Sequence, residues 1–576
     1  MSRKISLPNI FLPQFLLYTH HLEFSESWRG EVDRGGKFDR ISSKKKEKKS
    51  MGKFYLTTPV YYVNDVPHLG HAYTTIAADA LSRYRRLCGD EVFFLTGTDE
   101  HGSKILQAAR EKNLSPHQLA DQMVGEFKKL WDKLLISYSD FIRTTETRHI
   151  RVVENVFLEL YRKGDIYKGK YSGWYCIPCE SFWLESQLKD GKLCPECKRE
   201  VTRLKEDSYF FRLSKYQLPL LDYYSKHPDF VLPPTRMNEV IEFVKRGLRD
   251  ISITRLNLEW GIPCPVDKSH SVYVWIDALI NYISALGYSL DGKNFPIFWP
   301  ADVHLVGKDI LKFHAVIWPA LLMALGVELP RMVFAHGWWM VKGEKMSKSK
   351  KNVVDPGWIV DKFGSDYLRY FLLREVPFGE DGNFSPSLFV KRVNSDLAND
   401  LGNLLNRTLP LVIKYSQGKV PRPGKSTSED EELREKVEKL PSSLADFMQR
   451  LSFSQALASI LEAVRSTNLY LDRCAPWRLA KKGERQRAGT VLYNVLETMR
   501  ILTIFIFPFL PQGAEKIWQQ LGMQTDIKKQ TIGESVNWGT LSPGIEVKKG
   551  EPVFPRIREE DFYETQGETS TPAGDS

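Results

Sequence analysis

The segment Pro67-His68-Leu69-Gly70-His71 constrains the fold most, because it lies between an apolar run and a helical pattern. The apolar run, from Phe54 to Tyr62, is typical of a buried strand that ends in a turn. After the segment, apolar residues recur at helical spacing from Ala72 to Leu87. A second apolar run follows from Glu91 to Thr96. The order strand, turn, helix, strand predicts a βαβ unit and therefore an α/β fold.

His68 and His71 stand one helical turn apart at the predicted start of this helix. Backbone N–H groups and the helix dipole favour phosphate at such a position. Two other interpretations stay open for these residues alone, namely a metal-binding pair and two partly exposed polar residues. Further along, Asp99 and His101 follow the second strand, where open α/β sheets bind ligands, although both could also cap a helix.

A second segment, Lys345-Met346-Ser347-Lys348-Ser349, follows a predicted strand from Arg331 to Val341. Its lysine-rich loop, led by Gly343, does not suit a packed core element. The loop is either a solvated turn or a mobile clamp for a polyphosphate. The chain has no G-x-x-x-x-G-K-[ST] and no G-x-G-x-x-G segment, so the P-loop and dinucleotide interpretations lose their main support.

Two Cys-x-x-Cys pairs between the two halves of the α/β pattern indicate a metal site. They supply Cys176, Cys179, Cys194 and Cys197. Four thiolates at this spacing can close a tetrahedral zinc site, and redox-active pairs are the alternative. Because no coordination position stays open, the ion is expected to fold a small insert and to do no chemistry. This use of cysteine suits a reducing compartment better than disulfides do.

The order of these patterns predicts a Rossmann-like, doubly wound parallel-sheet domain that is split by a zinc-knuckle insert and followed by an all-α helix bundle. A length of 576 residues is too great for one core. The predicted segments are a leader at 1–50, the first half of the α/β domain at 51–165, the insert at 166–230, the second half at 231–345, the lysine loop with a following region at 346–386, the bundle at 387–545 and a tail at 546–576.

Net charge and hydropathy limit the kinds of partner that the chain can bind. Net charge is +10, and half of the excess lies in the leader, with eleven Lys/Arg against six Asp/Glu. Binding of a polyanion must therefore come from local patches of positive charge.

No apolar run is expected to reach the roughly 20 residues of a membrane helix. The leader fits neither a secretory signal nor an acid-poor transit peptide, so we expect a disordered extension or a mis-assigned start with Met51 as the true one.

Taken together, His68-Leu69-Gly70-His71 and Lys345-Met346-Ser347-Lys348-Ser349, on two halves of an α/β domain, resemble the signatures of the class I aminoacyl-tRNA synthetases. Over residues 52–545 the chain is most similar to the methionyl-tRNA synthetases. The resemblance implies that ATP activates L-methionine to methionyl-adenylate and pyrophosphate. The methionyl group then passes to the 3′-terminal adenosine of tRNA(Met), for initiation and elongation of translation.

The resemblance also implies roles for the two signatures. Adenylate formation needs positioning and cations more than covalent help. Histidines can hydrogen-bond the phosphate, and lysines on a closing loop can neutralise the departing pyrophosphate. The implied catalytic residues are His68, His71, Lys345 and Lys348. The implied ATP contacts are His68, Gly70, His71, Lys308, Asp309, Lys345, Met346, Ser347, Lys348 and Ser349.

The family's methionine pocket implies a second set of residues, which is Val60, Tyr62, Asp99, Trp275, Ala278, Tyr282, Ile310 and His314. Aromatic rings suit a polarisable thioether, and Asp99 offers a counter-charge for the substrate ammonium. Core packing is the alternative for the aromatic members. One departure is Leu279, where some members of the family carry proline.

In the bundle, the family's anticodon-binding positions correspond to Asn403, Arg407, Pro476 and Trp477. A Trp beside a Pro can stack on an unpaired base, and Asn and Arg can contact base edges, here of a CAU anticodon. A Trp that plugs the end of the bundle is the alternative. The resemblance further implies one structural Zn²⁺, Mg²⁺ with ATP, a cytoplasmic location, no membrane and a monomer, since no appended oligonucleotide-binding module is visible.

Four competing interpretations are weaker. Synthetases for isoleucine, leucine or valine carry a large editing insert, for which the insert here has no room. An enzyme that activates cysteine would place zinc at the substrate thiol, whereas four cysteines saturate this ion. A non-catalytic tRNA-binding protein would not need both signatures intact. A nucleotidylyltransferase would leave the long bundle unexplained.

Overall fold

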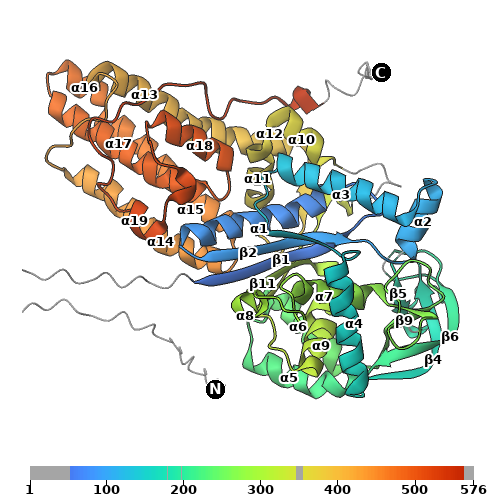
Figure 1. The fold of residues 1–576 in the computed structure, drawn as a ribbon. Helices are drawn as coiled ribbons and strands as arrows, with labels where there is room; N and C mark the ends of the chain where they lie inside the picture. Colours follow the sequence, from blue (N-terminus) through green and yellow to red (C-terminus); the bar gives the residue numbers. More distant parts are fainter. Residues whose placement is uncertain (1–51, 178, 184, 196, 346–353, 563–576) are drawn as a thin grey trace, which may run out of the picture. The chain divides into compact units, whose positions relative to one another are not determined.

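The computed structural model describes residues 52–562 except 178, 184, 196 and 346–353 (Figure 1). The predicted leader and the end of the tail therefore lie outside the described residues, as does the lysine loop from Met346 to Ser349. Residues 51–576 form one compact unit, so the segment boundaries predicted within it stay predictions.

A six-stranded, wholly parallel sheet carries the fold and confirms the α/β prediction. Its spatial order is β3-β2-β1-β11-β12-β7. The strands span, in chain order, β1 Lys53–Tyr62, β2 Glu91–Asp99, β3 Asp140–Arg143, β7 Val231–Leu232, β11 Val303–Gly307 and β12 Val333–His336. The predicted βαβ unit is β1, α1 (Leu69–Leu87) and β2.

Helices cover both faces of this sheet, as a doubly wound fold requires (Figure 1). Phe54 and Leu56 of β1 point into one core, with α1 and α3 (Pro116–Lys133), while Tyr55 points into the other. The second core is formed with α4 (Thr147–Arg162), α7 (Val274–Ser284) and α9 (Trp318–Leu325). Two shorter helices of this half are α2 (Ser103–Glu111) and α8 (Phe295–Phe298).

A smaller sheet carries the cysteine pairs. It consists of β4 (Ile166–Cys176), β5 (Ser181–Trp183), β6 (Thr202–Phe211) and β8 (Ile251–Ser252), all antiparallel. The chain then passes through α5 (Gln217–Lys226), β7 and α6 (Pro234–Lys245). The hairpin of β9 (Thr254–Leu256) and β10 (His270–Val272) leads to α7.

Beyond β12 the chain forms a small third sheet and then turns helical. The sheet contains β13 (Trp339–Val341), β14 (Glu344–Lys345) and β15 (Gly382–Phe384). The helices are α10 (Pro356–Phe363), α11 (Ser365–Arg374), α12 (Pro386–Val393), α13 (Asn403–Ser416), α14 (Ser428–Gln449), α15 (Phe453–Cys474), α16 (Pro476–Lys481), α17 (Arg485–Ile506), α18 (Pro511–Gln520) and α19 (Ile532–Ser535). The predicted helical region is thus present.

Helix α17 forms the centre of the bundle. Among the described residues it alone is long and apolar enough to cross a membrane, and that whole stretch is buried in the molecule. The expectation that no apolar run reaches this length is therefore wrong for α17. Its apolar surface packs against the surrounding helices, because its buried side chains belong to the same core as those of α13, α14 and α15.

Candidate active site

Two imidazoles cap the N-terminus of α1. The Nδ1 of His68 accepts the N–H of Gly70 at 3.0 Å, and the Nδ1 of His71 accepts the N–H of His68 at 3.1 Å. This is a capping box built from histidines. A Cβ on Gly70 would lie 2.9 Å from the His68 ring, so a larger residue at position 70 would collide with that ring. Because both Nδ1 atoms accept, each neutral ring carries its proton on Nε2 and presents an N–H donor.

The surroundings keep His71 neutral. Burial lowers the pKa of His71 well below its usual value, and the neighbouring His68 and Lys104 lower it further, because a second positive charge beside them would be unfavourable. Its ring meets the rings of Tyr61 and Phe127 edge-on, with centroids 4.8 and 5.4 Å away, and stacks on His68 at 3.9 Å. His71 therefore acts as a neutral hydrogen-bond donor and not as a cation.

The predicted site residues meet at the carboxyl edge of the large sheet. β1 ends before His68, β2 ends at Asp99, and β11 is followed at once by Lys308 and Asp309. β1 lies between β2 and β11, so the strand order reverses beside it. The crevice outside such a reversal is where open α/β sheets bind ligands.

Three side chains of the predicted methionine pocket carry buried polar atoms that lack a hydrogen-bond partner among the described residues. These atoms are the hydroxyl of Tyr62, Oδ1 of Asp99 and Nε1 of Trp275. Tyr62 and Asp99 are paired across β1 and β2, and the Tyr62 and Trp275 rings meet edge-on at 6.2 Å. Unpaired buried polar groups are costly, so their convergence indicates a place that a polar ligand fills.

Asp99 lies in a strongly negative environment. Burial raises its pKa well above the usual value, and the nearby carboxylates of Asp277 and Glu180 raise it further. Lys104 of α2 lies over the Tyr62 ring, with its Nζ 4.8 Å from the centroid. A cationic group beside Asp99 would relieve this excess of negative charge.

Asp277 is fully buried on α7 and binds two histidines. One oxygen lies 2.8 Å from Nδ1 of His101 and the other 2.6 Å from Nε2 of His149. Burial would raise the pKa of Asp277, but the two rings outweigh it and hold that pKa below the usual value. Asp277 was not predicted from the sequence, whereas His101 was considered for ligand contact or for capping of a helix. The one signal for Asp277 was its place two residues after Trp275.

The remaining predicted pocket residues lie on β1, on α7 and in the segment after β11. Tyr282 and His314 are joined by a 2.7 Å hydrogen bond, and the Nδ1–H of His314 donates to the carbonyl of Ile310 at 3.0 Å. Burial lowers the pKa of His314 to about 4, so the ring is neutral. Trp275 stacks on Phe313 at 3.8 Å. Ala278 is buried, and Val60 and Ile310 pack partly buried against the same core.

Directly after β11, Lys308 is ion-paired with Asp381, which precedes β15. Its Nζ lies 2.6 and 2.7 Å from the two carboxylate oxygens and 4.2 Å from the centre of the Trp338 ring. The indole N–H of Trp338 donates to Asp309 at 3.0 Å. The backbone of Lys345 ends β14, while Lys348 lies outside the described residues.

The four predicted metal-binding cysteines come together. Their Sγ atoms all lie within 4.8 Å of one another, with 3.5 Å between Cys176 and Cys197 and 3.9 Å between Cys179 and Cys194. A tetrahedral zinc ion with bonds of about 2.3 Å needs sulfurs about 3.8 Å apart, so the set fits such an ion. The cluster could therefore hold a metal ion.

Glu180, which directly follows Cys179, joins the metal cluster to the pocket. Its Oε1 accepts the N–H of Lys104 at 2.8 Å, at the start of α2, and its carbonyl accepts the hydroxyl of Tyr273. Its carboxylate also lies where a Cβ on Gly102 would be, 2.6 Å from the nearest oxygen. The sequence analysis missed Glu180, because only its position after Cys179 marks it.

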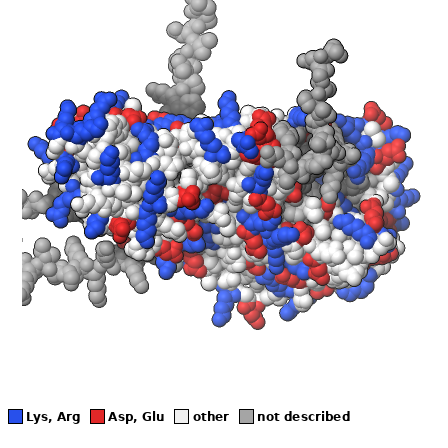
Figure 2. Space-filling model, turned by 90° about the horizontal axis from the view of Figure 1, so that it is seen from above, with Lys and Arg blue, Asp and Glu red and all other residues white. Residues whose placement is uncertain are grey.

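The predicted anticodon residues lie in the bundle. Asn403 lines a cavity of about 580 Å³ with Asn399, Asn406 and Arg556. Arg407 pairs with Asp472 of α15, and Trp477 is partly buried against the bundle core. Figure 2 shows Lys and Arg side chains gathered over the bundle at the left of the view. Exposed examples around Trp477 are Arg473, Arg478, Lys481, Lys482 and Arg485.

Comparison with protein families matches both halves of the chain. The model for class I tRNA synthetases (M) covers residues 54–206 and 200–409, and that for the anticodon-binding domain of methionyl tRNA ligase covers 420–571. The chain belongs to the methionyl-tRNA synthetases. Its activity is that of a methionine–tRNA ligase.

Individual relatives support the same family assignment. The chain is 54% identical over 506 residues to the methionine–tRNA ligase of Caldanaerobacter subterraneus subsp. tengcongensis, covering 88% of this chain and 79% of that protein. The Thermotoga maritima enzyme is 46% identical over 513 residues, covering 88% and 81%. The solved structure of the Mycobacterium tuberculosis methionyl-tRNA synthetase in complex with methionyl-adenylate is 43% identical in sequence and superimposes with a TM-score of 0.84. The match covers 88% of this chain and 100% of that one.

The capping geometry predicts that His71 stays a neutral Nε2–H tautomer across the physiological range. Its lowered pKa and its Nδ1 contact both oppose protonation, so its ring resonances should not titrate between about pH 6 and 8. Nitrogen-15 NMR of histidine-labelled protein measures this directly. Free histidine in the same buffer serves as the titrating reference. A His71 signal that shifts in step with free histidine would contradict the assignment.

Proposed function

We propose that the chain forms methionyl-adenylate and pyrophosphate from L-methionine and ATP, and then transfers the methionyl group to the 3′-terminal adenosine of tRNA(Met). The observation that carries the proposal is the set of three unpaired polar atoms, on Tyr62, Asp99 and Trp275, beside the two imidazoles of α1. An amino acid beside a phosphate would fill both places. The methionyl-adenylate bound to the Mycobacterium tuberculosis relative supports this ligand.

The methionine end is recognised by charge and by aromatic contact. Burial and neighbouring carboxylates disfavour the charged form of Asp99. The substrate ammonium stabilises that form, because it supplies a positive charge beside it. Tyr62 and Trp275 place ring edges and faces around the thioether, a favourable environment for sulfur. The neutral Tyr282–His314 pair closes the pocket without adding a charge. Val60, Ala278 and Ile310 supply the apolar wall.

At the phosphate end, the substrate carboxylate attacks the α-phosphorus and the bond to pyrophosphate breaks. The Nε2–H groups of His68 and His71 donate to the phosphate oxygens on which charge develops. Gly70, Lys308 and Asp309 contact the nucleotide. Lys345 and Lys348 neutralise the pyrophosphate, and Met346, Ser347 and Ser349 of the same loop contact the nucleotide. Mg²⁺ carried by ATP supplies further neutralisation of the phosphates.

In the bundle, Asn403, Arg407, Pro476 and Trp477 bind the CAU anticodon. The exposed Lys and Arg side chains around Trp477 provide the local positive patch that the modest net charge requires. We propose that initiator and elongator tRNA(Met) both bind there, that the protein is a monomer with no membrane partner, and that it acts in the cytoplasm.

We also propose that one structural zinc ion fills the cluster of Cys176, Cys179, Cys194 and Cys197. Four sulfurs at tetrahedral spacing leave no coordination position for substrate, so the ion orders the insert. The cluster is connected to the active site by Glu180, which follows Cys179 in the chain and accepts the N–H of Lys104.

The function is tested by pyrophosphate exchange with each of the twenty amino acids. Methionine alone should support exchange, and the purified protein should charge tRNA bearing CAU. A tRNA with its anticodon changed to another sequence is the matched control. Equal exchange with leucine or isoleucine would remove the specificity, and exchange without any charging would remove the transfer step.

His71→Ala and Trp477→Ala should separate the two steps. Loss of the His71 donor should lower exchange and charging together, by about 100-fold. Trp477→Ala should lower charging and leave exchange intact, because the bundle takes no part in activation. Steady-state rates for both reactions measure the split. A Trp477→Ala protein that loses both activities would instead assign Trp477 to the structure of the bundle.

Metal removal should unfold the insert. Elemental analysis of the purified protein should give one zinc per chain, and a strong chelator should lower the melting temperature as the ion leaves. Cys197→Ser should behave like the chelated protein. Cys264→Ser, which removes a buried cysteine outside the cluster, is the control and should keep the zinc. A full zinc content in Cys197→Ser would contradict the assignment.

A further inference from the structure

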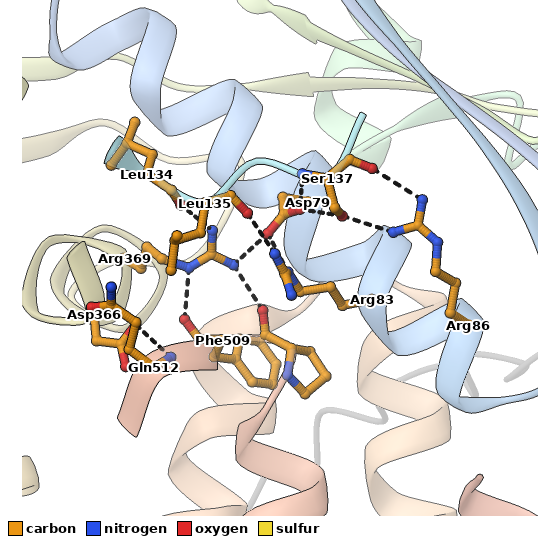
Figure 3. A network of polar contacts seen from close by, with 11 residues as sticks. Asp79, Arg83, Arg86, Leu134, Leu135, Ser137, Asp366, Arg369, Phe509 and Gln512 are labelled. Carbon is orange, nitrogen blue, oxygen red and sulfur yellow. Dashed lines mark hydrogen bonds and ion pairs between the residues drawn. The ribbon is translucent and has the colours of Figure 1, made fainter. Parts of the chain in front are cut away.

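Arg369 of α11 is fully buried and binds three separate parts of the chain (Figure 3). Its Nε donates to the carbonyl of Phe509 at 2.9 Å and its Nη1 to that of Leu134 at 3.0 Å. Its Nη2 donates to the carbonyl of Pro508 at 2.9 Å and lies 2.7 Å from Oδ2 of Asp79. One guanidinium thus joins α1, the end of α3 and the turn between α17 and α18.

Asp79, the acidic partner, belongs to α1 and is also fully buried. Besides Arg369 it accepts from Nε of Arg83 at 2.7 Å, and from the N–H and hydroxyl of Ser137 at 2.8 and 2.6 Å. Burial would raise its pKa, but Arg83 and Arg369 outweigh burial and lower the pKa of Asp79 to about 2. The carboxylate is therefore charged, and strong charge-assisted contacts surround it.

Asp79 fixes the helix that carries the active-site histidines. It lies eight residues after His71 on α1, which is about 12 Å along a helix axis. Since a hydrogen-bonded helix of this length moves as a rigid element, holding Asp79 also holds the two imidazoles at its N-terminus. The other end of the bridge, Pro508 and Phe509, lies just beyond Phe507, the C-cap of α17, which is the central helix of the bundle.

The bundle side of the joint has a second anchor on α11. Asp366 accepts the N–H of Gly513 at 2.5 Å and that of Gln512 at 3.4 Å, at the start of α18. Burial raises the pKa of Asp366 to about 6. Helix α11 therefore binds the α17–α18 turn through Arg369 and the start of α18 through Asp366. Of these two side chains, only Arg369 also contacts α1.

We propose that Arg369 is a positioning residue for the transfer step. It holds the bundle and α1 in one fixed arrangement, so that a tRNA bound at the bundle presents its 3′ end to the histidines of α1. The inference rests on the proposed function, because it uses the bundle as the anticodon-binding part. Without Arg369, Asp79 is still bound by Arg83 and Ser137, so α1 and its histidines keep their place in the active site. Methionine activation therefore does not depend on where the bundle lies.

Arginine is required for this bridge. Its planar fork serves four acceptors in different directions, whereas a lysine ammonium has three donors around a single point. Arg369→Lys keeps a positive charge near Asp79 but cannot reach Leu134, Pro508 and Phe509 together. It is therefore the variant that loosens the joint with the least change in charge.

The matched control is Arg500→Lys. Arg500 is equally buried but lies within α17, where it binds Glu497 of the same helix and the carbonyls of Ser535 and Asn537. Both variants remove a buried guanidinium that ties helices to backbone carbonyls. Of these two arginines, only Arg369 joins the bundle to α1, so a general loss of stability should appear in both variants and a loss of positioning in one.

We expect Arg369→Lys to lower kcat for charging by about tenfold, a typical size for coupling between sites, with KM for tRNA and the exchange rate nearly unchanged. Arg500→Lys should change exchange and charging in proportion. Exchange and charging rates, KM for tRNA and melting temperature are measured for both. A proportional loss in Arg369→Lys, or a selective loss of charging in Arg500→Lys, would overturn the proposal.

A double-mutant cycle with Trp477→Ala tests the connection to the bundle. If Arg369 acts through tRNA held at Trp477, the two substitutions should be non-additive in charging, although the residues are far apart in the sequence. Additive losses would overturn the proposal. Wild-type protein that fails to charge tRNA bearing CAU would sink the proposed function instead, so the two failures are distinguishable.

Asp366→Ala provides a second test if Arg369→Lys does not fold. It removes both oxygens that accept the N–H groups of Gly513 and Gln512, so the start of α18 loses its contact with α11. This loosening of α18 against α11 should again reduce charging and spare exchange, and hydrogen exchange at Gly513 reports the opened contact. Unchanged charging in a folded Asp366→Ala protein would overturn the proposal.

Discussion

The position of β1 between β2 and β11 is the constraint on which the rest of the structure depends. Leu56 pairs with Phe94 on one side and with Val303 on the other, and all three strands are parallel. β2 follows β1 through one helix, whereas β11 arrives only after the whole insert. Parallel pairing sets the carboxyl ends of these strands at one edge, so His68, Asp99 and Lys308 meet there because of the strand order.

That edge divides into two electrostatic halves. At the start of α1, the imidazoles use Nδ1 for capping and so face outward as neutral donors, which suits phosphate oxygens that already carry charge balanced by other cations. At the end of β2, Asp99 sits among carboxylates and lacks a neighbouring cation strong enough to restore its usual pKa. A zwitterionic amino acid with its ammonium at Asp99 and its carboxylate toward α1 matches both halves.

The sequence predicted the parts of the fold whose signal is local. Apolar periodicity identified β1, α1, β2 and the bundle, and the Cys-x-x-Cys spacing identified the metal cluster, because each pattern repeats within a few residues. β7, with only two residues, has no such pattern, although it pairs with β12. The pairing of Lys308 with Asp381 and the burial of Asp277 between His101 and His149 depend on long-range contacts. Side chains separated by 73 to 176 positions leave no periodic trace.

Glu180 connects the cysteine cluster to the candidate active site. Its φ of +46° is a left-handed conformation that a glutamate adopts only when its surroundings hold it there. The Cys176–Cys179 turn before it and the hydroxyl of Tyr273 on its carbonyl provide that hold. In this conformation its carboxylate caps α2 at Lys104 and adds negative charge near Asp99. A conformation that orders Cys179 therefore also orders a carboxylate near Asp99, so the cysteine cluster and the candidate active site are connected.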